Sequence, residues 1–281
     1  MKISQIYSQK KCTLSFEIFP PKGDLDILVI KSVLSELSTL CPDFISVTYS
    51  AGGSGKSNNT EAVASIIKDK YNINSIAHLT CANSSYEEIT NTIKKFKEHG
   101  IENVLALRGD LIQGARTTDF SHAKDLIPLL KNEDICVGAA CYPEGHVNCD
   151  SIEEDIMHLK EKQDAGADFF ISQLFFDNSY FYKFLDKAIS IGITKPVSPG
   201  VMPILSKSQI SKMIFMCGAS LPSEIIRLLN KYENDEVSLR KAGIEYAAKQ
   251  IGDLMNNNVS GIHIYTMNQS DIAKSILSLL G

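Results

Sequence analysis

The sequence predicts a closed barrel of eight parallel strands, each followed by at least one helix, the (β/α)8 or TIM barrel of the α/β class. Eight short apolar runs rich in β-branched and aromatic residues alternate with stretches of helical period. The chain has 281 residues, and about 250 residues are the usual size of a complete barrel of this kind. Polar and charged residues recur at the ends of the apolar runs, where barrel enzymes place their chemistry.

The predicted strands are almost continuously apolar, as expected where both faces of a parallel sheet are covered. No linker rich in Pro, Gly or Ser interrupts the chain, so residues 1–281 are expected to form one domain. The strands are expected at residues 14–19, 44–49, 75–80, 103–108, 136–141, 169–176, 196–204 and 261–267. Helices are expected at residues 25–40, 87–99, 152–165 and 180–191, with three more at 206–217, 222–232 and 235–256 before the last strand.

Helix start and stop signals support these assignments. Asp24 is placed as the N-cap of the first predicted helix. Before the helix at 152–165, Ser151 precedes Glu154 by the spacing of a capping box, and Gly166 follows its end, where a left-handed residue is common. The apolar stripe of the first helix is expected to comprise Leu25, Leu28, Val29, Ser32, Val33 and Leu37.

Composition argues against several classes of protein. The net charge is -5 and Lys and Arg do not cluster, so a nucleic-acid partner is not expected. The seven cysteines are scattered without a CxxC pair, so neither a disulfide framework nor a metal site is expected. The N-terminus lacks an apolar h-region, and no run approaches the ~18 apolar residues that span a bilayer. We therefore expect a cytoplasmic protein without a membrane partner.

Polar residues at the strand ends are the main functional signal. An ionised side chain buried without a partner is costly, so packing alone does not explain Glu or Arg in a strand. The carboxyl ends of barrel strands meet at one rim, and the sequence therefore predicts an active site there. The residues concerned are Glu17, Thr48, His78, Arg108, Gly109, Asp110, Tyr142, Gln173 and Asn268.

A glycine-rich loop offers an alternative function. The segment FISVTYSAGGSGKSNN at residues 44–59 approaches the P-loop pattern GxxxxGK[ST], so a nucleotide hydrolase is a second hypothesis. Two features depart from that pattern. Ser50 occupies the first glycine position, and the helical period starts only at Ala62, well beyond Lys56. The pattern GxGxxG is absent, which removes the main support for a Rossmann domain.

A series of motifs carries a family resemblance. In order along the chain they read SFEIFPPKG, VTYSAGGSG, HLTC, ALRGD, YPEGH, DAGADFFISQLFFD, PGVMPI and HIYTMN. The ordered set spans nearly the whole chain and resembles the motifs of methylenetetrahydrofolate reductases. The resemblance implies a barrel that holds FAD at its C-terminal rim. It also implies reduction of 5,10-methylenetetrahydrofolate to 5-methyltetrahydrofolate, an oxidoreductase step of one-carbon metabolism and methionine biosynthesis. The electrons would come from NADH or NADPH in a ping-pong reaction, and the family tends to form homo-oligomers.

The resemblance also assigns catalytic roles. Glu17 matches the acid that protonates N10 of the folate, opening its five-membered ring to the reducible 5-iminium cation. Burial would raise the pKa of such an acid towards neutral pH. Asp110 matches the carboxylate beside flavin and pterin, which would tune hydride transfer electrostatically. The alternatives are a salt bridge of Glu17 within the barrel mouth and a simple ion pair between Arg108 and Asp110.

Binding roles follow from the same resemblance. Asp155, His158 and Lys162 would lie on one helix face, Asp155 suited to a ribose hydroxyl and Lys162 to the pyrophosphate; a solvated charged face is the alternative. The folate contacts would be Asp110, Gln173 and Gln209, with Gln173 also serving the nicotinamide. The complete set of FAD contacts would be Thr48, Tyr49, Ala51, His78, Arg108, Gly109, Asp110, Tyr142, His146, Asp155, His158 and Lys162.

Three positions depart from the family pattern. Gln269 stands where an Arg commonly helps to hold the folate tail, and Leu174 and Met213 stand where aromatic residues are common. His263 and Tyr265 alternate on the last strand and are expected to be packing groups. The choice between NADH, NADPH and an electron-supplying partner protein stays open from the sequence.

Overall fold

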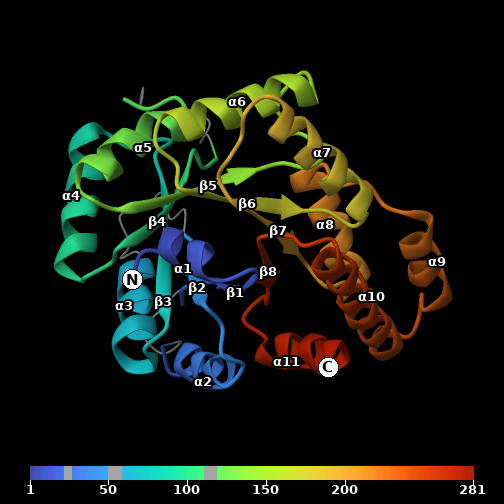
Figure 1. Cartoon of the computed structure of the whole chain (residues 1–281). Coiled ribbons are helices and arrows are strands. Elements are labelled where there is room, and N and C mark those ends of the chain that lie inside the picture. Colours follow the sequence, from blue (N-terminus) through green and yellow to red (C-terminus); the bar gives the residue numbers. More distant parts are fainter. Residues whose placement is uncertain (22–26, 50–58, 111–118) are drawn as a thin grey trace.

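The computed structural model describes residues 1–21, 27–49, 59–110 and 119–281, and its strands form one closed barrel in the order β1 to β8 (Figure 1). Every neighbouring pair is parallel, including β1 with β8. The predicted (β/α)8 barrel is therefore confirmed. The strands are β1 Thr13–Ile18, β2 Phe44–Val47, β3 Asn74–Thr80, β4 Asn103–Leu107, β5 Cys136–Cys141, β6 Phe169–Leu174, β7 Val197–Val201 and β8 Gly261–Tyr265.

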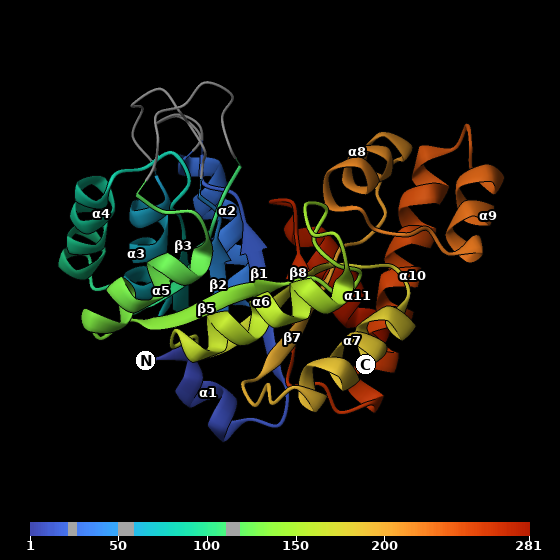
Figure 2. The same cartoon turned by 90° about the horizontal axis from the view of Figure 1, so that it is seen from above.

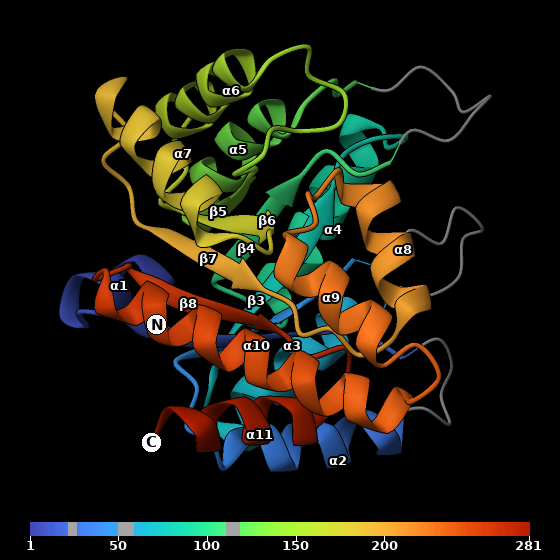
Figure 3. The same ribbon diagram turned by 90° about the vertical axis from the view of Figure 1, so that its right-hand side faces the viewer.

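The helices form a layer around the barrel, with extra helices between β7 and β8. Figure 2 shows α8 and α9 beside α10, away from α4 on the opposite side. In Figure 3, α10 and α11 run side by side, and α11 also packs on α2. The helices are α1 Ile3–Gln9, α2 Ile27–Ser38, α3 Thr60–Tyr71, α4 Tyr86–Glu98, α5 Ala123–Asn132, α6 Ile152–Asp164, α7 Asn178–Ser190, α8 Lys207–Cys217, α9 Ser223–Lys231, α10 Glu236–Asn256 and α11 Ser270–Leu280.

Four predicted strands, those of β2, β6, β7 and β8, extend two or three residues too far along the chain, and two of these have a clear reason. β6 ends at Leu174 and β7 at Val201, although the apolar sequence continues beyond both. The reason is a second small core outside the barrel, where Phe176, Met202 and Ile204 pack together under the extra helices. At these two positions, the first residues of each apolar run therefore pack in the barrel, and later residues of the same run pack in the second core.

The predicted stripe of α2 is wrong in part. Leu28 and Val29 are 73% and 60% exposed, and the buried face is formed instead by Ile30, Val33, Leu34 and Leu37. This face has the same i, i+3, i+4, i+7 spacing as the predicted stripe, so the helical period was right and the side of the helix that faces the core was misjudged. Asp24 and Leu25 lie outside the described residues. At α6 the prediction is better, because Ser151 accepts from the backbone N–H of Glu154 and Gly166 has a φ of +114°.

Helix α1 closes the N-terminal end of the barrel, near the centre of Figure 1. Ile3 and Ile6 are buried there against residues such as Phe44 and Phe169. The hydroxyl of Tyr7 lies 2.7 Å from Ser198 Oγ on β7. The opposite, C-terminal end of the barrel carries the polar residues singled out above.

Two glycines of α10 are expected to respond oppositely to substitution by alanine. A Cβ at Gly243 would lie 1.9 Å from the backbone oxygen of Ile204, whereas one at Gly252 would meet only Leu280 Cδ2 at 3.6 Å. Gly243→Ala should therefore lower the free energy of unfolding by about 2 kcal/mol or more. Gly252→Ala should raise it by about 0.5 kcal/mol, since alanine favours helix. Urea unfolding of both variants tests this, and equal effects would contradict the close approach at Gly243.

Candidate active site

A cavity of about 460 Å³ lies at the carboxyl ends of the barrel strands; we call it the rim cavity. Its lining brings together every strand-end residue predicted above except Asn268. The predicted residues that line it are Glu17, Thr48, His78, Arg108, Gly109, Asp110, Tyr142, His146 and Gln173. Strands β1 to β6 therefore all contribute to one site, as the sequence pattern predicted.

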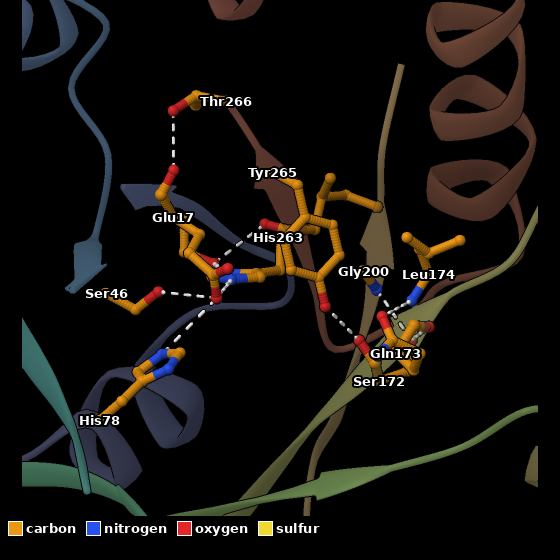
Figure 4. Close-up of polar contacts among 12 residues, drawn as sticks. Glu17, Ser46, His78, Ser172, Gln173, Leu174, Gly200, His263, Tyr265 and Thr266 are labelled. Carbon is orange, nitrogen blue, oxygen red and sulfur yellow. Dashed lines mark hydrogen bonds and ion pairs between the residues drawn. The ribbon is translucent and has the colours of Figure 1, made fainter. Parts of the chain in front are cut away.

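Glu17 lies deep in the rim cavity among three polar groups (Figure 4). Its Oε2 lies 3.5 Å from the Nε2 atoms of His78 and His263, and Ser46 Oγ donates to it across 3.5 Å. His263 is fully buried, and its Nδ1 lies 2.8 Å from Ser15 Oγ. Neighbouring strands thus surround one carboxylate that is only 13% exposed.

The pKa of Glu17 differs from the expectation. Burial raises the pKa of Glu17. Three effects together lower it by more: the hydrogen bond to His263, the positive charge on His78 and His263 when they are protonated, and the hydrogen bond from Ser46. The net direction is below the ordinary value. In the ligand-free site Glu17 is therefore ionised at neutral pH, and the expected rise in its pKa is wrong for this state.

His78 is expected to make stability depend on pH. Burial lowers the pKa of this imidazole to about 4, and the Glu17 carboxylate offsets only part of that effect. In the unfolded chain His78 takes up a proton near its ordinary pKa of 6.5. Its contribution to the stability of the fold is therefore complete above that pH and is lost as the pH falls towards 4. Between pH 7 and pH 5, His78 should lower the unfolding free energy of the wild type by about 2 kcal/mol, and this part of the fall should be absent from His78→Gln. Denaturant unfolding at several pH values measures it, with exposed His99→Gln as the control; parallel curves for wild type and His78→Gln would refute the assignment.

The end of β4 supplies a cation and a carboxylate to the cavity. Arg108 Nε donates to the carbonyl of Gly109 at 3.3 Å, and Asp110 is exposed at the mouth. In the described part of the chain Arg108 and Asp110 form no ion pair, so the alternative of a simple pair between them is not seen. Gly109 has a φ of +82°, and a Cβ there would lie 2.8 Å from Thr80 Cβ. Glycine is therefore required at this turn by both conformation and space.

A second, smaller cavity of about 140 Å³ adjoins the first; we call it the side cavity. The two share Leu107, Arg108, Ala140, Tyr142, His146 and Asn148 in their linings, so they lie next to each other. The rings of Tyr142 and His146 meet edge to face, with centroids 4.6 Å apart. Ring nitrogen Nδ1 of His146 accepts from the Asn148 N–H at 3.1 Å. An elongated ligand could therefore extend from the barrel mouth to the space beside α6.

Helix α6 presents Asp155, His158 and Lys162 to the side cavity, as the helical spacing predicted. Lys162 Nζ donates to the carbonyl of Ala140 at 3.0 Å and lies 5.5 Å from the centre of the Tyr142 ring. Burial lowers the pKa of Lys162 and raises that of Asp155, and each charge partly opposes the shift of the other. No ion pair of Lys162 occurs in the described residues. Its ammonium is thus a desolvated cation that still has N–H donors available for a ligand.

A family model of methylenetetrahydrofolate reductase matches residues 2–281. The chain belongs to the methylenetetrahydrofolate reductase family. The predicted family is thereby confirmed, and the names of the relatives describe an oxidoreductase.

Three relatives illustrate the match. Methylenetetrahydrofolate reductase 1 of Schizosaccharomyces pombe is 34% identical over 97% of this chain, which spans only 46% of that protein. The 5,10-methylenetetrahydrofolate reductase of Escherichia coli is 32% identical, and 97% and 92% of the two chains are covered. Methylenetetrahydrofolate reductase (NADH) 1 of Arabidopsis thaliana is 31% identical over the whole chain, which spans 50% of that protein.

One solved structure resembles this fold over nearly its full length. It is a Clostridium thermocellum protein described as binding two copies of 5-methyl-5,6,7,8-tetrahydrofolic acid. The TM-score is 0.65 at 15% identity, and 99% and 98% of the two chains are covered. At this identity the likeness concerns the fold. Among the helices that the structure describes, none is long and apolar enough to cross a membrane.

Some residues expected from the reductase motifs lie elsewhere. Tyr49 packs against the main core and does not line either cavity in the described residues. The side-chain amide of Gln209 bonds the backbone of Leu205 and Pro203, so local structure already uses it. The side-chain amide of Asn268 accepts from the backbone N–H of Phe19 and donates to the Phe19 carbonyl, so its role is structural. Ala51 and Lys56 lie outside the described residues.

The departures from the reductase pattern also have clear positions. Gln269 Oε1 accepts from Arg240 of α10, and that guanidinium also pairs with Asp271. Leu174 and Met213 pack in the small second core. Leu174 is thus directed away from the rim cavity, which its neighbour Gln173 lines.

Several lining residues were missed or misjudged. Tyr265 lines the rim cavity and His263 contacts Glu17, so the expectation that both only pack is wrong. The period-2 alternation of β8 was a usable signal, since it directs both side chains to the inner face. Residues without a polar strand-end signal were missed, among them Val147, Asn148, Met216 and Cys217 in the rim cavity and His122, Lys124, Cys149 and Glu161 in the side cavity.

Proposed function

We propose that this protein is an FAD-dependent methylenetetrahydrofolate reductase that converts 5,10-methylenetetrahydrofolate to 5-methyltetrahydrofolate with electrons from NADH or NADPH. The observation that carries the proposal is the pair of adjoining cavities, with Glu17 in the rim cavity and Lys162 in the side cavity. Family membership supplies the reaction class. The folate bound by the Clostridium thermocellum protein of similar fold is consistent with it.

The residues of the two cavities fit FAD. Arg108 and Lys162 offer charge-assisted donors for a pyrophosphate, and the buried Asp155 carboxylate suits a ribose hydroxyl. Tyr142 and His146, at the junction, offer aromatic surface for the chain between the two halves of the cofactor. When bound, FAD would take up a hydride equivalent from the nicotinamide and pass it to the folate.

Glu17 would act as the general acid at N10 of the folate. The ligand-free carboxylate is ionised, so it must be protonated in the complex. Flat ligands that fill the rim cavity would exclude water from Glu17 and thereby disfavour its charged form. The exposed Asp110 carboxylate at the mouth would attract the cationic iminium that ring opening produces.

A ping-pong order fits the single rim cavity. Its lining includes the side-chain amide of Gln173 at the end of β6, which would serve whichever substrate is bound. The nicotinamide would leave before the folate enters and makes the same contact. We further propose a homo-oligomer, which sedimentation velocity would test. The glycine-rich loop of the hydrolase alternative lies outside the described residues, and the family match gives that alternative no support.

The colour of the purified protein tests the proposal most directly. It should be yellow, with an absorbance band near ~450 nm that NADH or NADPH bleaches anaerobically and methylenetetrahydrofolate restores. Stopped-flow traces with each nicotinamide in turn would identify the electron donor. A colourless protein that cannot be reconstituted with FAD would overturn the proposal.

A further inference from the structure

The strand that carries Gln173 is irregular at that residue. The register between β6 and β7 shifts between Ile171 and Leu174, which leaves Ser172 and Gln173 without regular ladder partners on the β7 side, while Ser172 still pairs with Cys141 of β5. Side chains replace those partners. Ser172 Oγ accepts from the Gly200 N–H at 2.9 Å and donates to the Gln173 carbonyl at 2.9 Å. The Leu174 N–H donates to Gln173 Oε1 at 2.8 Å.

The Ser172 carbonyl receives its partner from two strands away. Tyr265 of β8 reaches across β7 and donates its hydroxyl to this carbonyl at 2.7 Å (Figure 4). Gly200 of β7 makes the crossing possible. A Cβ at Gly200 would lie 2.4 Å from the Ser172 carbonyl oxygen and 2.7 Å from the Tyr265 hydroxyl. Glycine on β7 and tyrosine on β8 therefore act together on the irregular part of β6.

These bonds determine which atom Gln173 offers to a ligand. Its Oε1 is held by the Leu174 N–H, and in the described residues no protein group accepts from its Nε2. Since Gln173 lines the rim cavity, the site presents a hydrogen-bond donor at this position. The ligand group that fits is an acceptor, such as a carbonyl oxygen or an unprotonated ring nitrogen.

We infer that Tyr265 is a positioning residue, whose hydroxyl holds the irregular segment of β6 so that the Gln173 amide donates to an acceptor on the bound substrate. The inference rests on the proposed function, since that function supplies the pterin and the nicotinamide amide as acceptors. Burial raises the pKa of Tyr265 well above its ordinary value, so the hydroxyl remains a donor throughout the working pH range.

A double-mutant cycle tests the inference. Tyr265→Phe should lower kcat/KM for methylenetetrahydrofolate about tenfold, mainly through KM. In a Gln173→Ala background the same change should cost less than about twofold, because the group that Tyr265 positions is gone. Tyr246→Phe is the matched control, since its hydroxyl donates to the Phe176 carbonyl at 2.6 Å outside both cavities. Both tyrosine variants should have similar thermal midpoints and full FAD content.

A second readout does not require turnover. The side-chain amide protons of Gln173 should give a dispersed pair of signals in NMR spectra of the wild type and Tyr246→Phe, and shift towards free glutamine values in Tyr265→Phe. Equal losses of activity in both backgrounds would mean that Tyr265 contacts the substrate itself, which overturns the inference. Unchanged Gln173 signals in Tyr265→Phe would overturn it as well. Absence of flavin or of any reductase activity in the wild type would instead count against the proposed function. In that case the NMR comparison would still decide whether Tyr265 positions Gln173.

Discussion

Replacing Glu17 by Gln is expected to reduce methylenetetrahydrofolate turnover by about 10³-fold while leaving reduction of bound FAD by the nicotinamide within about threefold of wild type. The amide retains the shape of the side chain and can still bond to His263 or Ser46, whose atoms lie 3.5 Å away. It cannot deliver a proton to N10. The oxidative half-reaction alone therefore depends on the carboxyl group.

Anaerobic stopped-flow experiments separate the two half-reactions. One trace follows bleaching of the flavin by the nicotinamide, and the other follows reoxidation by methylenetetrahydrofolate. Glu102→Gln is the matched control, because Glu102 pairs with Lys68 beside the opposite end of the barrel. If Glu17→Gln reoxidised at the wild-type rate, Glu17 would not be the acid. If both half-reactions failed equally, its role would be structural.

Replacing Lys162 by Met should weaken FAD binding by about 100-fold without unfolding the protein. The ammonium is desolvated, lies in the side cavity and has no ion-pair partner among the described residues, so a pyrophosphate would gain a strong contact there. Methionine has a similar length and suits a partly buried position. The folded protein is therefore expected to tolerate the change better than the complex does.

Titration of apoprotein with FAD, followed by quenching of flavin fluorescence, measures this loss. Lys160→Met is the control, since Lys160 lies on the same helix and pairs with Asp164 rather than facing the cavity. Equal affinities of the Lys160 and Lys162 variants for FAD would show that the side cavity does not hold the pyrophosphate.

The sequence predicted the barrel and most of the rim because both depend on local patterns. Alternating apolar runs mark strands, and polar residues at their carboxyl ends identify Glu17 and Gln173. The same reasoning misjudged Asn268, whose amide bonds the backbone of Phe19. The amide of Gln209, a folate contact only by the family resemblance, likewise bonds nearby backbone. A polar residue type shows that a hydrogen bond is needed, but it does not show whether a ligand or the chain makes it.

Long-range effects could not be predicted from the pattern either. The pKa of Glu17 is lowered through His263, which lies 246 residues away in the sequence, and through His78 on β3. Helix α1 was missed because it is short and buries only Ile3 and Ile6, too few residues for a clear helical period. Both outcomes depend on which elements the closed barrel brings into contact.

Closure of the barrel between β1 and β8 also has a consequence for synthesis of the chain on the ribosome. β1 emerges before the other strands, but His263 and Asn268, which contact its end and the residue after it, are made only after strands β2 to β7. Pairing ends so far apart is entropically costly and comes late in folding. A nascent chain lacking β8 would thus hold Glu17 without one of its histidines and with one wall of the rim cavity missing. The rim cavity would be complete only after β8 has been synthesised, so chains that lack β8 would not compete for its ligands.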